Sequence, residues 1–233
     1  MTFAELDFAS ILLRSAVYVA TIATAGGVLF YATVRGAGEV SGAIRRQMWL
    51  GTLLLLAVEP LRYLQFQLAI SGGDWEVAFD PSMRWMAFET PIGQAAVVRI
   101  AAAVTILLAG LRLWPIALAA ALAMVGSFAL EGHTASHEGD GWVPAALIVV
   151  HLAMVHWWLG ALYPLRAATL VVGDSNIRDL VERFGKLALA AVAVLTAAGA
   201  LLMASHRPDR GKPIPLYIKR RPASRLERQS DQP

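Results

Sequence analysis

The sequence contains no cysteine, so disulfide bonds, thiolate metal sites and cysteine nucleophiles are all excluded. Charge is also scarce: only 16% of the residues are Asp, Glu, Lys or Arg, against about a quarter in an ordinary soluble domain. Catalytic signatures are absent too, since neither an HExxH zinc motif nor a nucleophile elbow occurs. These absences argue against hydrolytic chemistry, and we expect that the protein is not an enzyme.

Apolar side chains dominate instead, at 57% of the residues and a mean hydropathy of +0.56. Several runs reach about 20 apolar residues, the length that crosses a hydrocarbon core. The sequence therefore predicts an all-α fold, a polytopic transmembrane bundle of about six helices. The expected helices cover residues 8–34, 47–70, 95–111, 116–130, 143–165 and 184–205. We expect a polar loop at residues 71–94 and a charged connector at 166–182.

Positive charge is concentrated at one end of the sequence. The net charge is +3 and the pI is near 9.5, but eight of the 20 Lys and Arg residues lie in 206–233. The others mostly flank apolar runs, where positive charge sets membrane topology, so no nucleic-acid partner is expected. We interpret residues 1–205 as one transmembrane domain and residues 206–233 as a basic, disordered tail.

The Lys and Arg distribution predicts that the N-terminus and the loops after the second and fourth helices face the periplasm. This orientation gives each ionisable residue inside an apolar run an approximate depth in the membrane, so these residues can be compared by depth. An intramembrane charge network is expected from Arg14, Glu59, Arg62 and Arg99. The simplest interpretation of the arginines is pairing with Glu59 or Glu131, or extension of their guanidinium groups toward the interface.

Four of the five histidines lie between residues 131 and 160. Two precede the fifth apolar run and two lie within it, where a metal-binding side chain is costly to bury. The candidate metal ligands of this stretch are His133, His137, His151, His156, Met154 and Glu131.

Helical spacing separates some of these candidates. His151 and His156 are five residues apart, or about 140° around a helix, so they cannot point at one centre. His151 shares a face with Met154, and an imidazole with a thioether suits Cu(I). The simpler alternatives are that Met154 is packing filler, that His156 hydrogen-bonds a neighbouring helix, and that the other histidines are solvated.

Four segments carry a resemblance to a known family. They are TPIGQAAVVRI at 90–100, GSFALEGHTASH at 126–137, HLAMVHWWLGAL at 151–162 and RFGKLALAAVAVLTAAGALLM at 183–203. Over about residues 8–205 the sequence resembles the copper resistance protein D family of bacterial inner-membrane proteins. The family pattern of a His, a Trp six residues later and then small residues is matched by His151, Trp157 and Gly160, with His156 as an additional histidine.

The resemblance implies copper handling, with the ion moved across the inner membrane toward the cytoplasm. Residues 131–137 would capture copper, and the ligands at 151–156 would pass it inward. Family members continue after the fourth segment with further helices, so the resemblance also implies a form shortened at the C-terminus.

Two other functions are compatible with the same residues. A membrane b-type cytochrome would use His133, His151 or His156 as axial haem ligands on neighbouring helices. An accessory subunit without a ligand of its own would use its outer loops to bind a periplasmic partner, such as a copper-binding protein.

Overall fold

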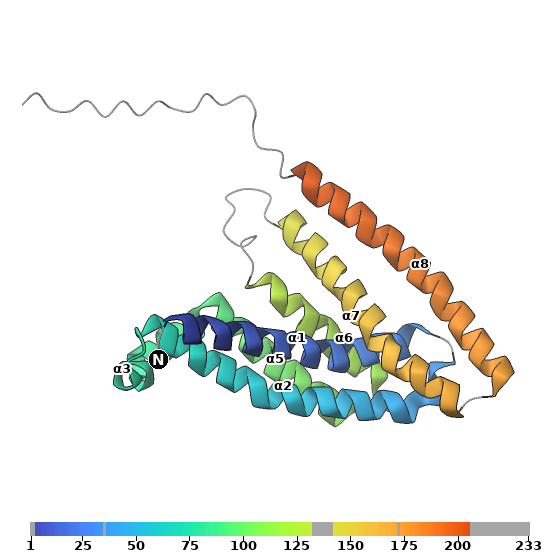
Figure 1. The fold of residues 1–233 in the computed structure, drawn as a ribbon, viewed down its shortest axis with the longest axis horizontal. Coiled ribbons are helices and arrows are strands. Elements are labelled where there is room, and N and C mark those ends of the chain that lie inside the picture. The colour runs from blue at the N-terminus through green and yellow to red at the C-terminus, as the bar shows by residue number, and fades with distance from the viewer. Residues whose placement is uncertain (1–2, 35, 132–141, 172, 206–233) are drawn as a thin grey trace, which may run out of the picture.

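The computed structural model describes residues 3–34, 36–131, 142–171 and 173–205, and every element in these ranges is helical (Figure 1). The first half of the chain contains α1 (Phe3–Thr33), η1 (Ala37–Val40), α2 (Ser41–Ile70), α3 (Trp75–Phe79) and α4 (Pro81–Glu89). The second half contains α5 (Pro91–Ala109), α6 (Trp114–Gly126), η2 (Ser127–Ala129), α7 (Trp142–Val171) and α8 (Asp174–Ser205).

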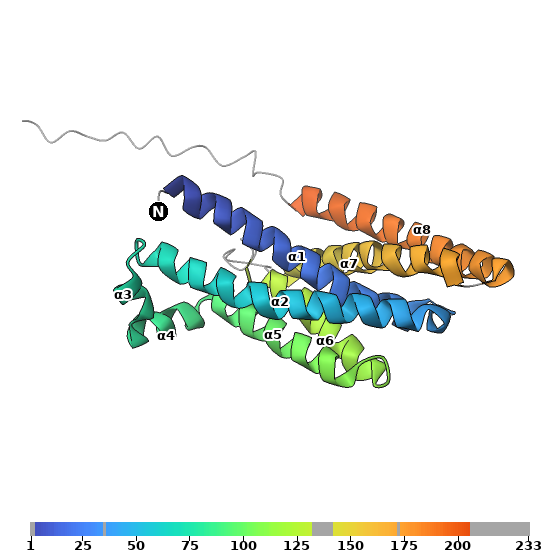
Figure 2. The same cartoon turned by 60° about the horizontal axis from the view of Figure 1, so that its bottom comes forward.

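The long helices lie alongside one another as a bundle. Figure 2 shows the start of α1 with α3 and α4 at one end, and the α1–α2, α5–α6 and α7–α8 connections at the other. Helix α1 packs against α2, α6 and α7, whereas α8 packs mainly against α7. Helix α1 is therefore the element around which the others are arranged.

Five helical segments of the described residues are long and apolar enough to cross a membrane. They are Phe8–Thr33, Ala37–Ile70, Pro91–Ala109, Ala145–Leu170 and Asn176–Leu201. A shorter apolar helix, Trp114–Ala129, corresponds to the fourth helix expected from the sequence. The prediction of an all-α transmembrane bundle is confirmed.

Residues 71–94 are not the irregular loop that the sequence suggested, because they contain α3 and α4. The Asp74 carboxylate accepts a hydrogen bond from the Glu76 backbone N–H at 2.9 Å, and Asp80 accepts one from the Ser82 backbone N–H at 2.8 Å. Such caps satisfy N–H groups that have no partner inside a helix. The acids that indicated a polar loop therefore begin two short helices.

The connector expected at 166–182 is also largely helical, since α7 continues to Val171 and α8 begins at Asp174. Its charged residues are spaced to pair along one helix face, and Lys186 Nζ lies 2.6 Å from Glu182 Oε1. Pairs at this spacing stabilise exposed helices, which explains why the charged segment extends α8.

Helices α1 and α7 touch backbone to backbone. A Cβ atom on Gly160 would lie 2.5 Å from the Gly26 Cα, and one on Gly26 would lie 2.8 Å from the Gly160 Cα. The side chain of Gln47, in α2, donates to the Gly160 carbonyl at 2.9 Å and to the Ala23 carbonyl at 3.1 Å. This contact brings the middle of α7 against the centre of the bundle.

Candidate functional site

Four charged side chains meet between α2, α5 and the end of η2: Glu59, Arg62, Arg99 and Glu131, which we call the buried quartet. Arg62 donates to Glu59 Oε1 at 3.0 Å and to Glu131 Oε2 at 2.8 Å. Arg99 Nη2 donates to Glu59 Oε1 at 2.7 Å and to Glu131 Oε1 at 2.5 Å. Two guanidinium groups and two carboxylates give a cluster of zero formal charge.

The quartet is deeply buried. The side chains of Glu59 and Arg99 are 0% exposed, and that of Glu131 is 16% exposed. Arg99 Nη1 also donates to Ser127 Oγ at 3.2 Å, and its guanidinium carbon lies 5.1 Å from the centroid of the Phe128 ring. Charges in a low-dielectric interior are tolerated only when paired, so each member of the quartet depends on the others.

The structure brings together three of the four residues expected in the charge network, Glu59, Arg62 and Arg99. Glu131, expected as a metal ligand, is the fourth member, and both of its oxygens accept from guanidinium groups. Arg14 lies apart, exposed on α1, and makes no ion pair with any described residue.

His156 is completely buried between α7 and α1. Its Nδ1 lies 2.7 Å from the Leu152 carbonyl oxygen, and its Nε2 lies 3.1 Å from Thr21 Oγ1. A carbonyl oxygen can only accept, so Nδ1 carries a proton and donates it to Leu152. In the neutral ring, Nε2 then presents a lone pair toward α1.

This lone pair faces the Thr21 hydroxyl group, whose proton has a second acceptor within reach. Thr21 donates its hydroxyl proton to the Tyr18 carbonyl at 3.0 Å in its own helix. While it does so, Nε2 of a neutral His156 faces an oxygen lone pair across 3.1 Å. The Thr21 hydroxyl can instead rotate and donate its proton to Nε2, which makes the 3.1 Å contact an ordinary hydrogen bond. Nε2 of the buried imidazole therefore has the Thr21 hydroxyl of α1 as its hydrogen-bonding neighbour.

The other candidates on α7 point elsewhere. His151 is exposed, whereas Met154 lines an apolar cavity of about 220 Å³ together with Trp157 of α7 and Leu187 of α8. Because His151, Met154 and His156 lie on different sides of α7, they do not converge on one metal centre. In the ranges the structure describes, no group of three or more His, Asp or Glu residues could hold a metal ion.

Two sequence candidates, His133 and His137, lie outside the described residues. The described histidines are His151 and His156, both on α7. Among them there is accordingly no pair of axial haem ligands from neighbouring helices.

Sequence reasoning missed a row of buried polar side chains between α1 and α2, which we call the polar seam: Thr21, Thr24, Gln47 and Thr52. The Thr24 and Thr52 hydroxyl oxygens and Gln47 Oε1 have no partner among the described residues. The available signal was the occurrence of Thr and Gln inside apolar runs, which a search for ionisable groups passes over. Two of its members contact α7: Gln47 donates to the Gly160 carbonyl, and Thr21 lies beside His156 Nε2.

Comparison with known proteins gives one family. The model of the Copper resistance protein D-like, N-terminal domain matches residues 5–143. No curated protein and no solved structure matches the chain. The matched stretch contains the whole buried quartet and the polar seam, whereas His156 lies beyond it.

Proposed function

This chain belongs to the copper resistance protein D-like family, and from that premise we propose that it moves copper across the bacterial inner membrane toward the cytoplasm. The ion is cargo rather than a resident cofactor, and the protein performs no catalysis on it. The family membership and the multi-pass bundle support a membrane protein of copper resistance. That this chain itself transports copper is our proposal beyond its family membership.

The buried imidazole of His156 carries the proposal. Its Nδ1–H is fixed on the Leu152 carbonyl at 2.7 Å, so Nε2, which lies 3.1 Å from Thr21 Oγ1, is the nitrogen left to bind a metal. A backbone acceptor on one ring nitrogen is the arrangement that orients the other nitrogen toward a metal. A neutral imidazole suits Cu(I). A site with few ligands also suits passage, because an ion in transit must be released again.

The remaining steps of copper transport use the candidate metal ligands in the order in which they occur in the sequence. His133 and His137 capture copper on the periplasmic side, delivered by a periplasmic copper-binding protein. The charge of Glu131 is compensated by Arg62 and Arg99, so we assign it to the quartet and leave capture to the two histidines. His151 and Met154 lie along α7 between the capture site and His156 in sequence, and serve as intermediate ligands.

The proposed orientation places the N-terminus in the periplasm. Figure 2 shows the α1–α2 and α5–α6 connections at the end of the bundle opposite the start of α1. Arg45 and Arg46 begin α2 at that end, and Arg112 lies in the α5–α6 turn. Positive charge in short connections marks the cytoplasmic side.

Copper transport can be measured with purified protein in liposomes that contain a Cu(I)-sensitive chelating dye. We expect His156→Ala to slow dye loading about tenfold or more, the loss typical of a disturbed metal site. The replacement of His133, His137, His151 and His156 by Ala should abolish loading. His206→Ala, at the fifth histidine, is the matched control and should load normally.

Equal loading and equal Cu(I) affinity in the wild type and the fourfold variant would refute the proposal. A visible spectrum of the same preparation separates copper transport from electron transfer. A Soret band would show that the histidines bind haem and would favour the cytochrome alternative.

A further inference from the structure

Among the described residues, Arg14 forms no ion pair with another charged group. It lies six residues after Phe8, the start of the first membrane segment, which is about 9 Å along the helix axis. It is exposed, and no described residue forms an ion pair or hydrogen bond with its guanidinium group. A cation at this depth is expensive unless an anion accompanies it. The fold of the described residues does not supply that anion.

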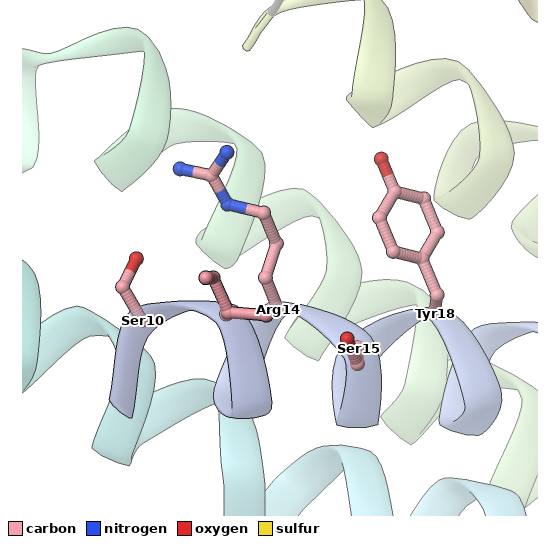
Figure 3. Close-up of a pocket in the computed structure, with 5 residues that line it drawn as sticks. Ser10, Arg14, Ser15 and Tyr18 are labelled. Carbon is pink, nitrogen blue, oxygen red and sulfur yellow. The ribbon is translucent and has the colours of Figure 1, made fainter. Parts of the chain in front are cut away.

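Hydroxyl groups lie beside Arg14 in a cavity that also has an apolar wall. A cavity of about 400 Å³ is lined by Ser10, Ile11, Arg14, Ser15 and Tyr18. Figure 3 shows the Arg14 guanidinium and the Ser10 and Tyr18 hydroxyl groups extending to the same side of α1, as their spacing of four residues requires. None of the described residues that line the cavity carries a carboxylate. A planar guanidinium with hydroxyl groups on either side is suited to the oxygens of a phosphate.

The cavity has one wall that is held in place. The Tyr18 ring stacks on Phe128 with a centroid distance of 4.9 Å and an interplanar angle of 8°. Phe128 in turn lies against the Arg99 guanidinium of the buried quartet. The Tyr18 hydroxyl is therefore positioned by the packed part of the bundle, so this side of the site is formed before a ligand arrives.

The same stretch of α1 exposes large apolar side chains. Phe8, Ile11 and Leu12 are 69%, 65% and 59% exposed, and Ile11 itself lines the cavity. Exposed apolar surface beside a cationic pocket fits an amphiphile, which brings a phosphate and acyl chains together. Inorganic phosphate would use the guanidinium but not the apolar surface.

We propose that α1 carries a binding site for one anionic phospholipid, whose phosphate is held by Arg14 with Ser10 and Tyr18 and whose acyl chains lie along Ile11 and its exposed neighbours. An anionic headgroup is favoured over a zwitterionic one, because the cation of the described lining, Arg14, has no carboxylate beside it there to receive an ammonium group. The site shares no residue with the proposed copper pathway. A test of lipid binding therefore does not depend on whether the chain transports copper.

The test uses the delipidated full chain in a neutral detergent, titrated with phosphatidylglycerol, with phosphatidylcholine or with inorganic phosphate, and measured by native mass spectrometry. We expect one phosphatidylglycerol molecule to bind more tightly than any phosphatidylcholine. Arg14→Gln should weaken its binding about tenfold or more, the effect of losing a charge-assisted hydrogen bond. Tyr18→Phe keeps the ring and should cost a smaller factor.

Arg112→Gln is the matched control, because it removes an exposed arginine that is not part of the lining of this cavity. Far-UV circular dichroism of each variant verifies that the helices are intact. Unchanged phosphatidylglycerol binding in Arg14→Gln overturns the proposal, and so does an equal loss in Arg112→Gln. Displacement of the lipid by millimolar inorganic phosphate would show a site for the free anion, and would also overturn it.

Discussion

Replacement of Arg99 by Met tests whether the buried quartet holds the bundle together. Arg99 is fully buried and contributes one of the two positive charges of the cluster. Met is unbranched and flexible and fills much of the same space without a charge, although its side chain is shorter. The substitution therefore isolates the electrostatic role of the guanidinium from its volume.

The structure sets the size of the effect. Without Arg99, Glu59 keeps Arg62 alone as its partner, and the cluster carries one uncompensated negative charge. Removal of one member of a buried pair typically costs about 3–5 kcal/mol. Addition of Glu59→Gln restores a neutral cluster in which Arg62 and Glu131 remain paired. The double variant should thus recover about 1–3 kcal/mol, the usual range of coupling between contacting residues.

The free energy of unfolding can be measured by SDS titration in mixed micelles, followed by far-UV circular dichroism. Arg112→Met, at an exposed position, is the matched control and should change stability by about 0.5 kcal/mol or less. A loss below about 1 kcal/mol for Arg99→Met, or a double variant less stable than the single one, would contradict the argument. Either result would mean that water or another ion compensates Glu59.

Two further predictions concern packing and a helix cap. Gly160→Ala places a methyl group 2.5 Å from the Gly26 Cα and should destabilise the bundle by about 1–3 kcal/mol in the same titration. Gly199→Ala, where an added Cβ meets nothing within 4 Å, should not, and equal stability of the two variants would count against the glycine contact. The hydrogen bond from the Ser82 hydroxyl lowers the pKa of Asp80 below its ordinary value of 3.8. The stabilising contribution of the Asp80 cap is therefore fully present above pH 3.8. This contribution is lost as the pH falls through the lowered pKa. The hydrogen-exchange protection of the Ser82 amide should follow this titration in the wild type and be independent of pH in Asp80→Asn.

Depth in the membrane was readable from the sequence, but rotation around each helix axis was not. Counting along the apolar runs placed Arg14, Glu59, Arg62 and Arg99 at comparable levels. A soluble helix reveals its inner face through hydrophobic periodicity, whereas a helix in lipid is apolar on all sides. The side of α1 that Arg14 occupies could therefore not be predicted, and it separates this arginine from the quartet.

For the candidate site, too, some features could be predicted from the sequence and others could not. The spacing of His151 and His156 was enough to predict that they cannot share a centre, because that depends only on helix geometry. The partner of His156 is Thr21, which is 135 residues away. No local pattern connects these two residues, so the hydrogen bond, and the polar seam beside it, became visible only when α1 and α7 were placed in contact.

The Thr21–His156 pair also bears on how the protein is made. When α1 enters the membrane during synthesis, α7 does not yet exist, and a bare hydroxyl group in lipid would be unfavourable. Thr21 arrives with its proton already donated to Tyr18 in its own helix, and His156 arrives with Nδ1–H already donated to Leu152 in its own. Each helix can thus be inserted separately, and Nε2 gains its neighbour on α1 only when α7 docks. The contact forms together with the other polar contacts of α7, from Gln47 to the Gly160 carbonyl and from Trp157 to Thr33, and it is the one at which we place the ion.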